Sequence, residues 1–238
     1  MTMVDFELAV QDPHGLAVAA RLGVDRVELC SALALGGLTP SRGLIEAALE
    51  TPGIPPVHVL IRPRPGGFVY DPDELTLIIR DIRNVRVMGA SGVVVGGVRA
   101  GEVDIALVER AVDAAGDLPL TFHRAFDTLA DPERAVETLV RLGVRRVLAS
   151  ATDLGALAAA VSAAAGRIEI MAGGGLRPDL VDKVVRTGVD AVHASAKRVV
   201  PDPVGVSLGT ASPAGGGRET TDEHEAARLM AALRAIKL

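Results

Sequence analysis

One short pattern recurs along the 238 residues of this sequence and constrains its fold more than any other feature. A glycine stands a few residues ahead of an apolar run rich in β-branched residues, at Gly23, Gly53, Gly89, Gly116, Gly143, Gly166 and Gly188. Residues 22–27 (LGVDRV), 142–147 (LGVRRV) and 187–192 (TGVDAV) are near copies of one another. Because glycine accepts the left-handed backbone that closes a helix, each copy predicts the end of a helix and the start of a strand.

One further strand ahead of the first helix completes eight strand–helix units. The apolar runs predict strands near residues 6–10, 26–30, 56–62, 92–97, 118–124, 146–150, 168–173 and 191–195. Alternating units in a chain of this length are typical of a single (β/α)8 TIM barrel, which we expect to span residues 1–238 as one domain. The functional site of such a barrel lies at the carboxyl ends of its strands.

Composition and charge exclude several classes of function. The formal net charge of −5 is spread thinly, without the clustered Lys and Arg of proteins that bind nucleic acid or membrane surfaces. The chain shows neither a signal segment nor an apolar stretch long enough to span a bilayer, so we expect a cytoplasmic protein. The single cysteine, Cys30, excludes an intramolecular disulfide. Residues 201–220 lack a clear pattern, and we expect a flexible loop there before the last helix.

Ionisable residues interrupt the apolar strands at positions that alternation turns into the barrel. Side chains of a barrel strand alternate between the interior and the helix layer, which places an inward set at Glu7, Glu28, His58, Arg62, His123 and His193. A buried charge requires a partner, so we expect the two glutamates to meet Arg62 or an inward histidine. Two interpretations stay open. The set is either a satisfied polar plug that holds the barrel together, or a functional site near the strand ends.

Several blocks of the sequence resemble the CutC family of copper homeostasis proteins. The blocks are, in order, RVELC (26–30), GGLTPS (36–41), IRPR (61–64), TFHRAFD (121–127), RVLAS (146–150), IMAGGG (170–175), VHAS (192–195) and DEH (222–224). They cover essentially the whole chain up to the final helix. The resemblance implies a TIM barrel, in agreement with the glycine pattern.

The resemblance also implies a cytoplasmic role in copper handling, with Cu(I) bound through cysteines. Cys30 matches the family cysteine of the second strand, whereas the other family cysteine falls on Ala9 in this sequence. Copper(I) favours soft sulfur ligands, and this chain offers one thiolate where the family pattern offers two. The ion would then lie between subunits of a homo-oligomer, or be held by Cys30 together with a histidine.

A competing hypothesis is an enzyme that acts on a small anionic, perhaps phosphorylated, metabolite. Glycines follow the seventh strand and a serine lies at the end of the eighth, where TIM barrels often hold phosphate. Nearby arginines would add positive charge. The anion-binding set is Gly173, Gly174, Gly175, Ser195, Arg62, Arg64 and Arg124. Alternatively, the three glycines only make a tight turn. His123 is the preferred general acid or base, because a histidine pKa lies near neutrality. Further catalytic candidates are Glu28, Glu7, Asp127 and His193.

Overall fold

Eight parallel strands close into a barrel in the computed structural model, which describes residues 4–201 and 217–236. The barrel closes because β1 hydrogen-bonds both to β2 and to β10. The strands are β1 (Asp5–Val10), β2 (Arg26–Leu29), β3 (Val57–Leu60), β4 (Gly92–Val95), β7 (Leu120–Phe122), β8 (Arg146–Ser150), β9 (Glu169–Gly173) and β10 (Ala191–Ala194). The prediction of a single TIM barrel is confirmed, and each predicted strand lies within two residues of the observed one.

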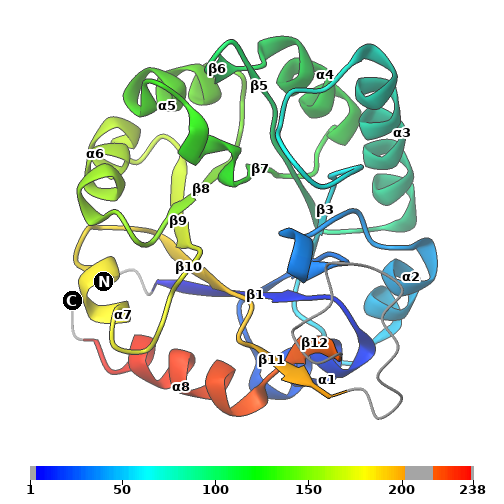
Figure 1. The fold of residues 1–238 in the computed structure, drawn as a ribbon, viewed down its shortest axis with the longest axis vertical. Helices are drawn as coiled ribbons and strands as arrows, with labels where there is room; N and C mark the ends of the chain where they lie inside the picture. Colours follow the sequence, from blue (N-terminus) through cyan, green and yellow to red (C-terminus); the bar gives the residue numbers. More distant parts are fainter. Residues whose placement is uncertain (1–3, 202–216, 237–238) are drawn as a thin grey trace.

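Helices surround the barrel as a ring (Figure 1). They are α1 (Pro13–Leu22), α2 (Arg42–Glu50), α3 (Pro72–Met88), α4 (Ile105–Ala115), α5 (Pro132–Arg141), α6 (Leu154–Ala164), α7 (Val181–Val185) and α8 (Glu223–Arg234), with short 3-10 helices η1 (Leu33–Leu35) and η2 (Arg124–Thr128). Asp71 begins α3 with a capping box, in which its side chain accepts from the backbone N–H of Glu74. Gly89 then ends α3 in the left-handed conformation at φ 93°, as the glycine pattern predicts.

Consecutive side chains of each strand point alternately to the helix layer and into the barrel, so the strands contribute to two separate cores. The large side chains Phe6, Leu8 and Leu29 face the helix layer and belong to the main hydrophobic core. Inside the barrel, the apolar groups of the described residues form two small clusters, one around Cys30, Leu60 and Val94 and one around Leu148, Met171 and Ala191. Much of the remaining interior is therefore polar, in agreement with the predicted strand parity.

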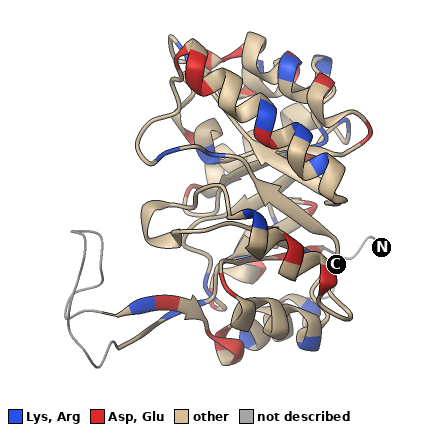
Figure 2. Cartoon of the chain, turned by 90° about the vertical axis from the view of Figure 1, so that its right-hand side faces the viewer, with Lys and Arg blue, Asp and Glu red and all other residues tan. Residues whose placement is uncertain are grey.

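In the part of the chain that the structure describes, two antiparallel hairpins lie at the carboxyl ends of barrel strands. The first joins β5 (Val98–Arg99) to β6 (Glu102–Val103), and the second joins β11 (Lys197–Val200) to β12 (Arg218–Thr221). Most of the loop predicted at 201–220 lies outside the described residues, but its carboxyl end belongs to β12 and is ordered by pairing with β11. Figure 2 shows this second hairpin projecting from the barrel, and blue and red bands intermixed along the helices. No described helix has the length and apolar character needed to cross a membrane.

Candidate functional site

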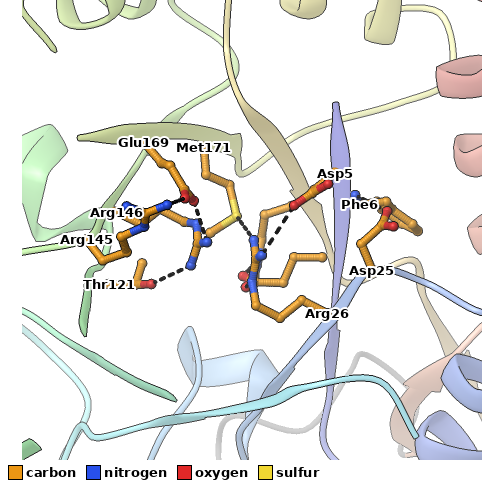
Figure 3. Close-up of polar contacts among 11 residues, drawn as sticks. Asp5, Phe6, Asp25, Arg26, Thr121, Arg145, Arg146, Glu169 and Met171 are labelled. Carbon is orange, nitrogen blue, oxygen red and sulfur yellow. Dashed lines mark hydrogen bonds and ion pairs between the residues drawn. The ribbon is translucent and has the colours of Figure 1, made fainter. Parts of the chain in front are cut away.

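The amino-terminal half of the barrel interior holds a buried network of ion pairs (Figure 3). Arg26 Nε donates to Oε2 of Glu7 at 2.5 Å, and its Nη2 lies 3.4 Å from the sulfur of Met171. Arg146 forms an ion pair with Glu169 and donates to Oγ1 of Thr121 at 3.2 Å. Arg26, Arg146 and Glu169 are the first residues of their strands. The plug interpretation therefore fits the charges at this end of the barrel, which are paired, although Nε of Arg146 and Nδ1 of His58 have no partner among the described residues.

Above this plug, Glu7 and Glu28 both lie close to His193. Oε1 of Glu7 lies 2.8 Å from Nδ1 of His193, while Oε2 of Glu28 has no partner among the described residues. Burial is the largest influence on Glu7, yet the hydrogen bond and charge of His193, with Arg26, lower its pKa. Burial acts to lower the pKa of His193, but the charge of Glu28 and the contact with Glu7 raise it overall. Burial raises the pKa of Glu28 to about 7, aided by the charge of Glu7.

Glu28 and His193 form part of the wall of a cavity of about 670 Å³ that opens at the carboxyl ends of the strands. Among the residues predicted for a site, those that line it are Glu28, Arg62, His123, Arg124, Asp127, Gly174, Gly175, His193 and Ser195. Glu7, Arg64, Gly173 and Cys30 are absent from its lining. Glu7 is fully buried and contacts His193 from below.

Arg62 reaches the cavity without any carboxylate partner among the described residues, so of the two partners expected for the glutamates it is the inward histidine, His193, that meets Glu7. Nη1 of Arg62 donates to the carbonyl oxygens of Leu35 and Gly37 at 3.0 and 2.9 Å, and its Nη2 donates to that of Gly66 at 2.7 Å. Glu7 instead binds Arg26, which shares the inward parity of Glu28. That parity was the signal in the sequence that could have identified Arg26 as an inward residue. Which inward arginine pairs with Glu7 depends on the register between strands.

Arg64 lies outside the cavity, contrary to its predicted place in the anion-binding set. It forms an ion pair with Glu74, and its guanidinium stacks over the ring of Tyr70 at 5.1 Å. It also donates to the carbonyl oxygens of Gly67 and Val69. Through these contacts Arg64 holds the loop after β3 in place against α3.

His123 is buried and neutral, so the predicted pKa near neutrality is wrong. Burial and then the charge of Arg62 lower its pKa to about 3. Nδ1 accepts the backbone N–H of Ala125 at 3.1 Å and thereby caps η2. Because β7 ends before His123, the following Arg124 leaves the strand alternation and turns to the cavity mouth.

Part of the cavity rim is held together by contacts around Arg124. Nε of Arg124 donates to Oδ2 of Asp127 at 2.7 Å, while Oδ1 of Asp127 accepts the backbone N–H of Ser150 at 2.8 Å. Asp127 thus positions Arg124 and has both oxygens engaged. Gly174 adopts φ 77°, and a Cβ there would clash with the Arg124 guanidinium. Only glycine lets that guanidinium lie against the loop backbone.

Cys30 is fully buried among apolar side chains, and its thiol lies 3.5 Å from the carbonyl oxygen of Val10. Burial raises the pKa of this thiol well above its usual range, and the charge of Glu28 adds to the effect. Ligating atoms of Glu7, Glu28 and His193 do lie within 4.8 Å of one another. Both oxygens of Glu7 are already bound, however, by Arg26 and His193, and oxygen-rich groups are not the soft ligands that Cu(I) prefers.

Comparison with known proteins agrees with the resemblance in the sequence. The sequence model of the CutC family matches residues 4–198. A family protein CutC from Caulobacter vibrioides is 46% identical over 203 residues, which cover 82% of each chain. One from Sinorhizobium medicae is 40% identical over 248 aligned residues, covering 99% of this chain and 98% of that protein. A crystal structure from Streptococcus agalactiae, provisionally described as the copper homeostasis protein CutC, is 32% identical with a TM-score of 0.77, covering 81% of this chain and 99% of that one.

Proposed function

The chain belongs to the CutC family, and we propose that it is an enzyme that binds a small anionic metabolite at the barrel mouth and transfers a proton through Glu28. The observation that carries this proposal is the environment of Glu28. It is a carboxyl group with a pKa of about 7 in the wall of a large cavity. Structural charges are usually paired, whereas Oε2 of Glu28 has no partner among the described residues.

A carboxyl group with this pKa suits both directions of proton transfer. Near pH 7 it is populated in its ionised and its protonated form, which is the condition for an efficient general acid or base. His193 lies beside it and is held by Glu7 through Nδ1, so the ring has a fixed orientation. Glu28 is thus the proton carrier, His193 its neighbour in the cavity wall, and Glu7 a positioning residue beneath them.

The charge of Arg62 supports an anionic ligand. Its guanidinium contacts carbonyl oxygens and the ring of Phe68 and has the hydroxyl of Tyr70 as a further neighbour, and none of these groups carries a negative charge. Arg124, Gly174 and Ser195 lie on the same cavity wall and add donors at the rim. A phosphate or carboxylate group in the cavity would supply the missing negative charge.

A role in copper homeostasis is the second candidate, and the description of the solved relative from Streptococcus agalactiae favours it. The residues of this chain do not fit a resident Cu(I) site. Cys30 lies outside the cavity lining with its thiol protonated, and Arg26 lies against the sulfur of Met171. A positive charge next to a thioether opposes metal binding at that sulfur.

The proposed function is tested by a metabolite screen in D₂O. The protein is incubated with a panel of phosphorylated and carboxylated metabolites, and ¹H NMR follows both turnover and exchange of carbon-bound protons. We expect turnover or exchange of at least one compound, reduced about 10²-fold or more by Glu28→Gln, which keeps the shape but cannot ionise. Glu109→Gln, on the exposed surface of α4, is the matched control. An inert wild-type protein that also fails to bind inorganic phosphate in calorimetry contradicts the proposal.

A further inference from the structure

The ring of His193 is held between the two strands that flank β10. Glu7 of β1 and Gly173 of β9 stand directly opposite it in the barrel register. On the β1 side, Nδ1 lies 2.8 Å from Oε1 of Glu7. On the β9 side the ring lies close to the backbone, because a Cβ added at Gly173 would stand only 3.0 Å from Cδ2 of His193. The edge of the ring that carries Cε1 and Nε2 is therefore the one left free.

This free edge meets the cavity. His193 belongs to the cavity lining, and 12% of its side-chain surface is exposed. Its Nε2 is not among the side-chain atoms of the described residues that are buried without a partner, whereas Nε2 of His123 is. Of the two histidines in the lining, His193 is thus the one whose outer nitrogen a molecule in the cavity can reach.

Glu7 determines which nitrogen of His193 takes part in proton transfer. Burial acts to raise the pKa of Glu7, but the contact with His193 and the charge of Arg26 lower it overall, so this carboxyl group is ionised. Because an ionised carboxylate only accepts hydrogen bonds, Nδ1 of His193 carries a proton in both states of the ring. The proton that is gained and lost is therefore the one on Nε2. A carboxylate on the other nitrogen also fixes the orientation of the imidazole.

The charges around His193 favour its protonated form. The acidic groups beside it are Glu7 of β1 and Glu28 of β2, and the basic group is Arg26 of β2. On the side of β9 the ring meets Gly173, which has no charge. Burial acts to lower the pKa of His193, but Glu28 and Glu7 raise it overall. A carboxylate oxygen of Glu28 lies within 4.8 Å of a ring nitrogen, so the two groups can act on one small molecule.

We infer that His193 is a second catalytic residue, which donates a proton from Nε2 to an oxygen of the substrate next to the carbon that loses its proton to Glu28. This inference rests on the proposed function and adds an acid to its base, with Glu7 as the positioning residue of that acid. The class of substrate is a small anion with a hydroxyl group beside an aldehyde or ketone, and the class of reaction is isomerisation.

The proposed steps need no oxidant or reductant. Glu28 takes a proton from carbon, the electron pair of that C–H bond forms a carbon–carbon double bond, and the carbonyl π pair takes the Nε2 proton of His193. The product is an enediol, with Glu28 protonated and His193 neutral. His193 then takes the proton of the other hydroxyl group, a carbonyl forms at that carbon, and the electron pair of the double bond takes the proton of Glu28. Both groups end in the state in which they began.

The first test replaces His193 by glutamine, which keeps a polar side chain but cannot transfer a proton. The substrate is a compound turned over in the D₂O screen, and calorimetry with phosphoglycolate, an anion with a phosphate and a carboxylate group, measures binding. We expect His193→Gln to lower turnover about 10²-fold or more and to change this affinity less than about threefold. His58→Gln is the matched control, since His58 is buried inside the barrel but outside the cavity lining; it should keep both properties.

The pH profile separates a proton donor from a structural residue. The active form has Glu28 ionised and His193 protonated, so wild-type turnover should fall at acidic pH, as Glu28 with its pKa of about 7 takes up a proton, and fall again at alkaline pH, as His193 loses one. His193→Gln should lose the alkaline limb. It should keep the acidic limb, moved to higher pH because the charge of His193 no longer lowers the pKa of Glu28. Unchanged turnover, or both limbs retained in this variant, overturns the inference and leaves Glu28 as the proton carrier.

A second measurement needs no variant. Diethylpyrocarbonate modifies accessible imidazole nitrogens, and peptide mass spectrometry of native wild-type protein should find His193 modified. Phosphoglycolate at ten times its Kd should slow this modification about tenfold, with no effect on the exposed His14 of α1 as internal control. A His193 that reacts only after unfolding, or that phosphoglycolate does not protect, overturns the inference alone. A wild-type protein that is inert in the screen and binds neither phosphoglycolate nor inorganic phosphate removes the proposed function as well.

Discussion

Glu7 and His193 meet at the seam where the barrel closes, with Oε1 of Glu7 2.8 Å from Nδ1 of His193. Their strands, β1 and β10, pair with Glu7 directly opposite His193. The second oxygen of Glu7 accepts from Arg26 of β2, so one carboxylate links the first, second and last strands of the barrel. This contact joins the polar plug below to the cavity above.

Replacement of Glu7 by glutamine should destabilise the protein strongly. The change leaves Arg26 buried without its closest anionic partner, and removing one member of a buried ion pair costs about 3–5 kcal/mol. Urea unfolding measures the difference. Asp5→Asn is the matched control on the same strand, because Asp5 is half exposed and lies 3.8 Å from Arg26; its cost should be below about 1 kcal/mol. Equal effects of the two substitutions would show that the plug contributes little.

Glu28→Gln should stabilise the protein at alkaline pH and leave it unchanged at acidic pH. The ordinary pKa of 4.5 for this carboxyl rises to about 7 in the folded protein. Stabilisation by the bound proton is therefore complete below pH 4.5 and is lost as the pH rises through 7. The ionised carboxylate then costs roughly 3 kcal/mol, which glutamine avoids. Unfolding at pH 5 and pH 8 measures the effect against Glu109→Gln, and a gain that is the same at both values refutes the assignment.

Two arginines of the loop after β3 should differ in their effect on anion binding. Arg62→Gln removes a charge in the cavity wall that has no carboxylate partner among the described residues, so the affinity for phosphoglycolate should fall about tenfold or more. Arg62→Lys retains the charge and should recover part of the affinity. Arg64→Gln removes a charge already neutralised by Glu74 outside the cavity and should leave the affinity unchanged. Calorimetry on the three variants checks this order, and a larger loss with Arg64→Gln would contradict it.

The thiol of Cys30 should be unreactive in the native protein. Its thiol is fully buried and its pKa is raised by burial, so reaction with a thiol reagent such as DTNB should require unfolding in urea. Competition with a Cu(I) chelator should give the same copper affinity for wild type and Cys30→Ala. Rapid DTNB reaction of native protein, or loss of one stoichiometric Cu(I) on Cys30→Ala, would instead support copper binding through sulfur.

Much of this architecture could be predicted from local patterns in the amino-acid sequence. Glycine at helix ends and β-branched runs after it establish the strand–helix alternation, because both depend on backbone preferences of neighbouring residues. Alternation along single strands also turns Glu7, Glu28 and His193 inward, since consecutive side chains point to opposite faces. The carboxyl ends of the strands could be named as the location of the candidate site because the strand–helix alternation predicts a TIM barrel, whose sites lie there.

The partners of these inward residues were decided by tertiary structure alone. Barrel closure brings Arg26, and not Arg62, to Glu7, because register between strands far apart in the sequence determines which charges meet. Similarly, the end of β7 frees Arg124, and the fold of the loop after β3 carries Arg64 away from the cavity. The neutral state of His123 depends on burial and on a backbone donor. Solvation and long-range pairing are properties of the closed barrel, and no local pattern encodes them.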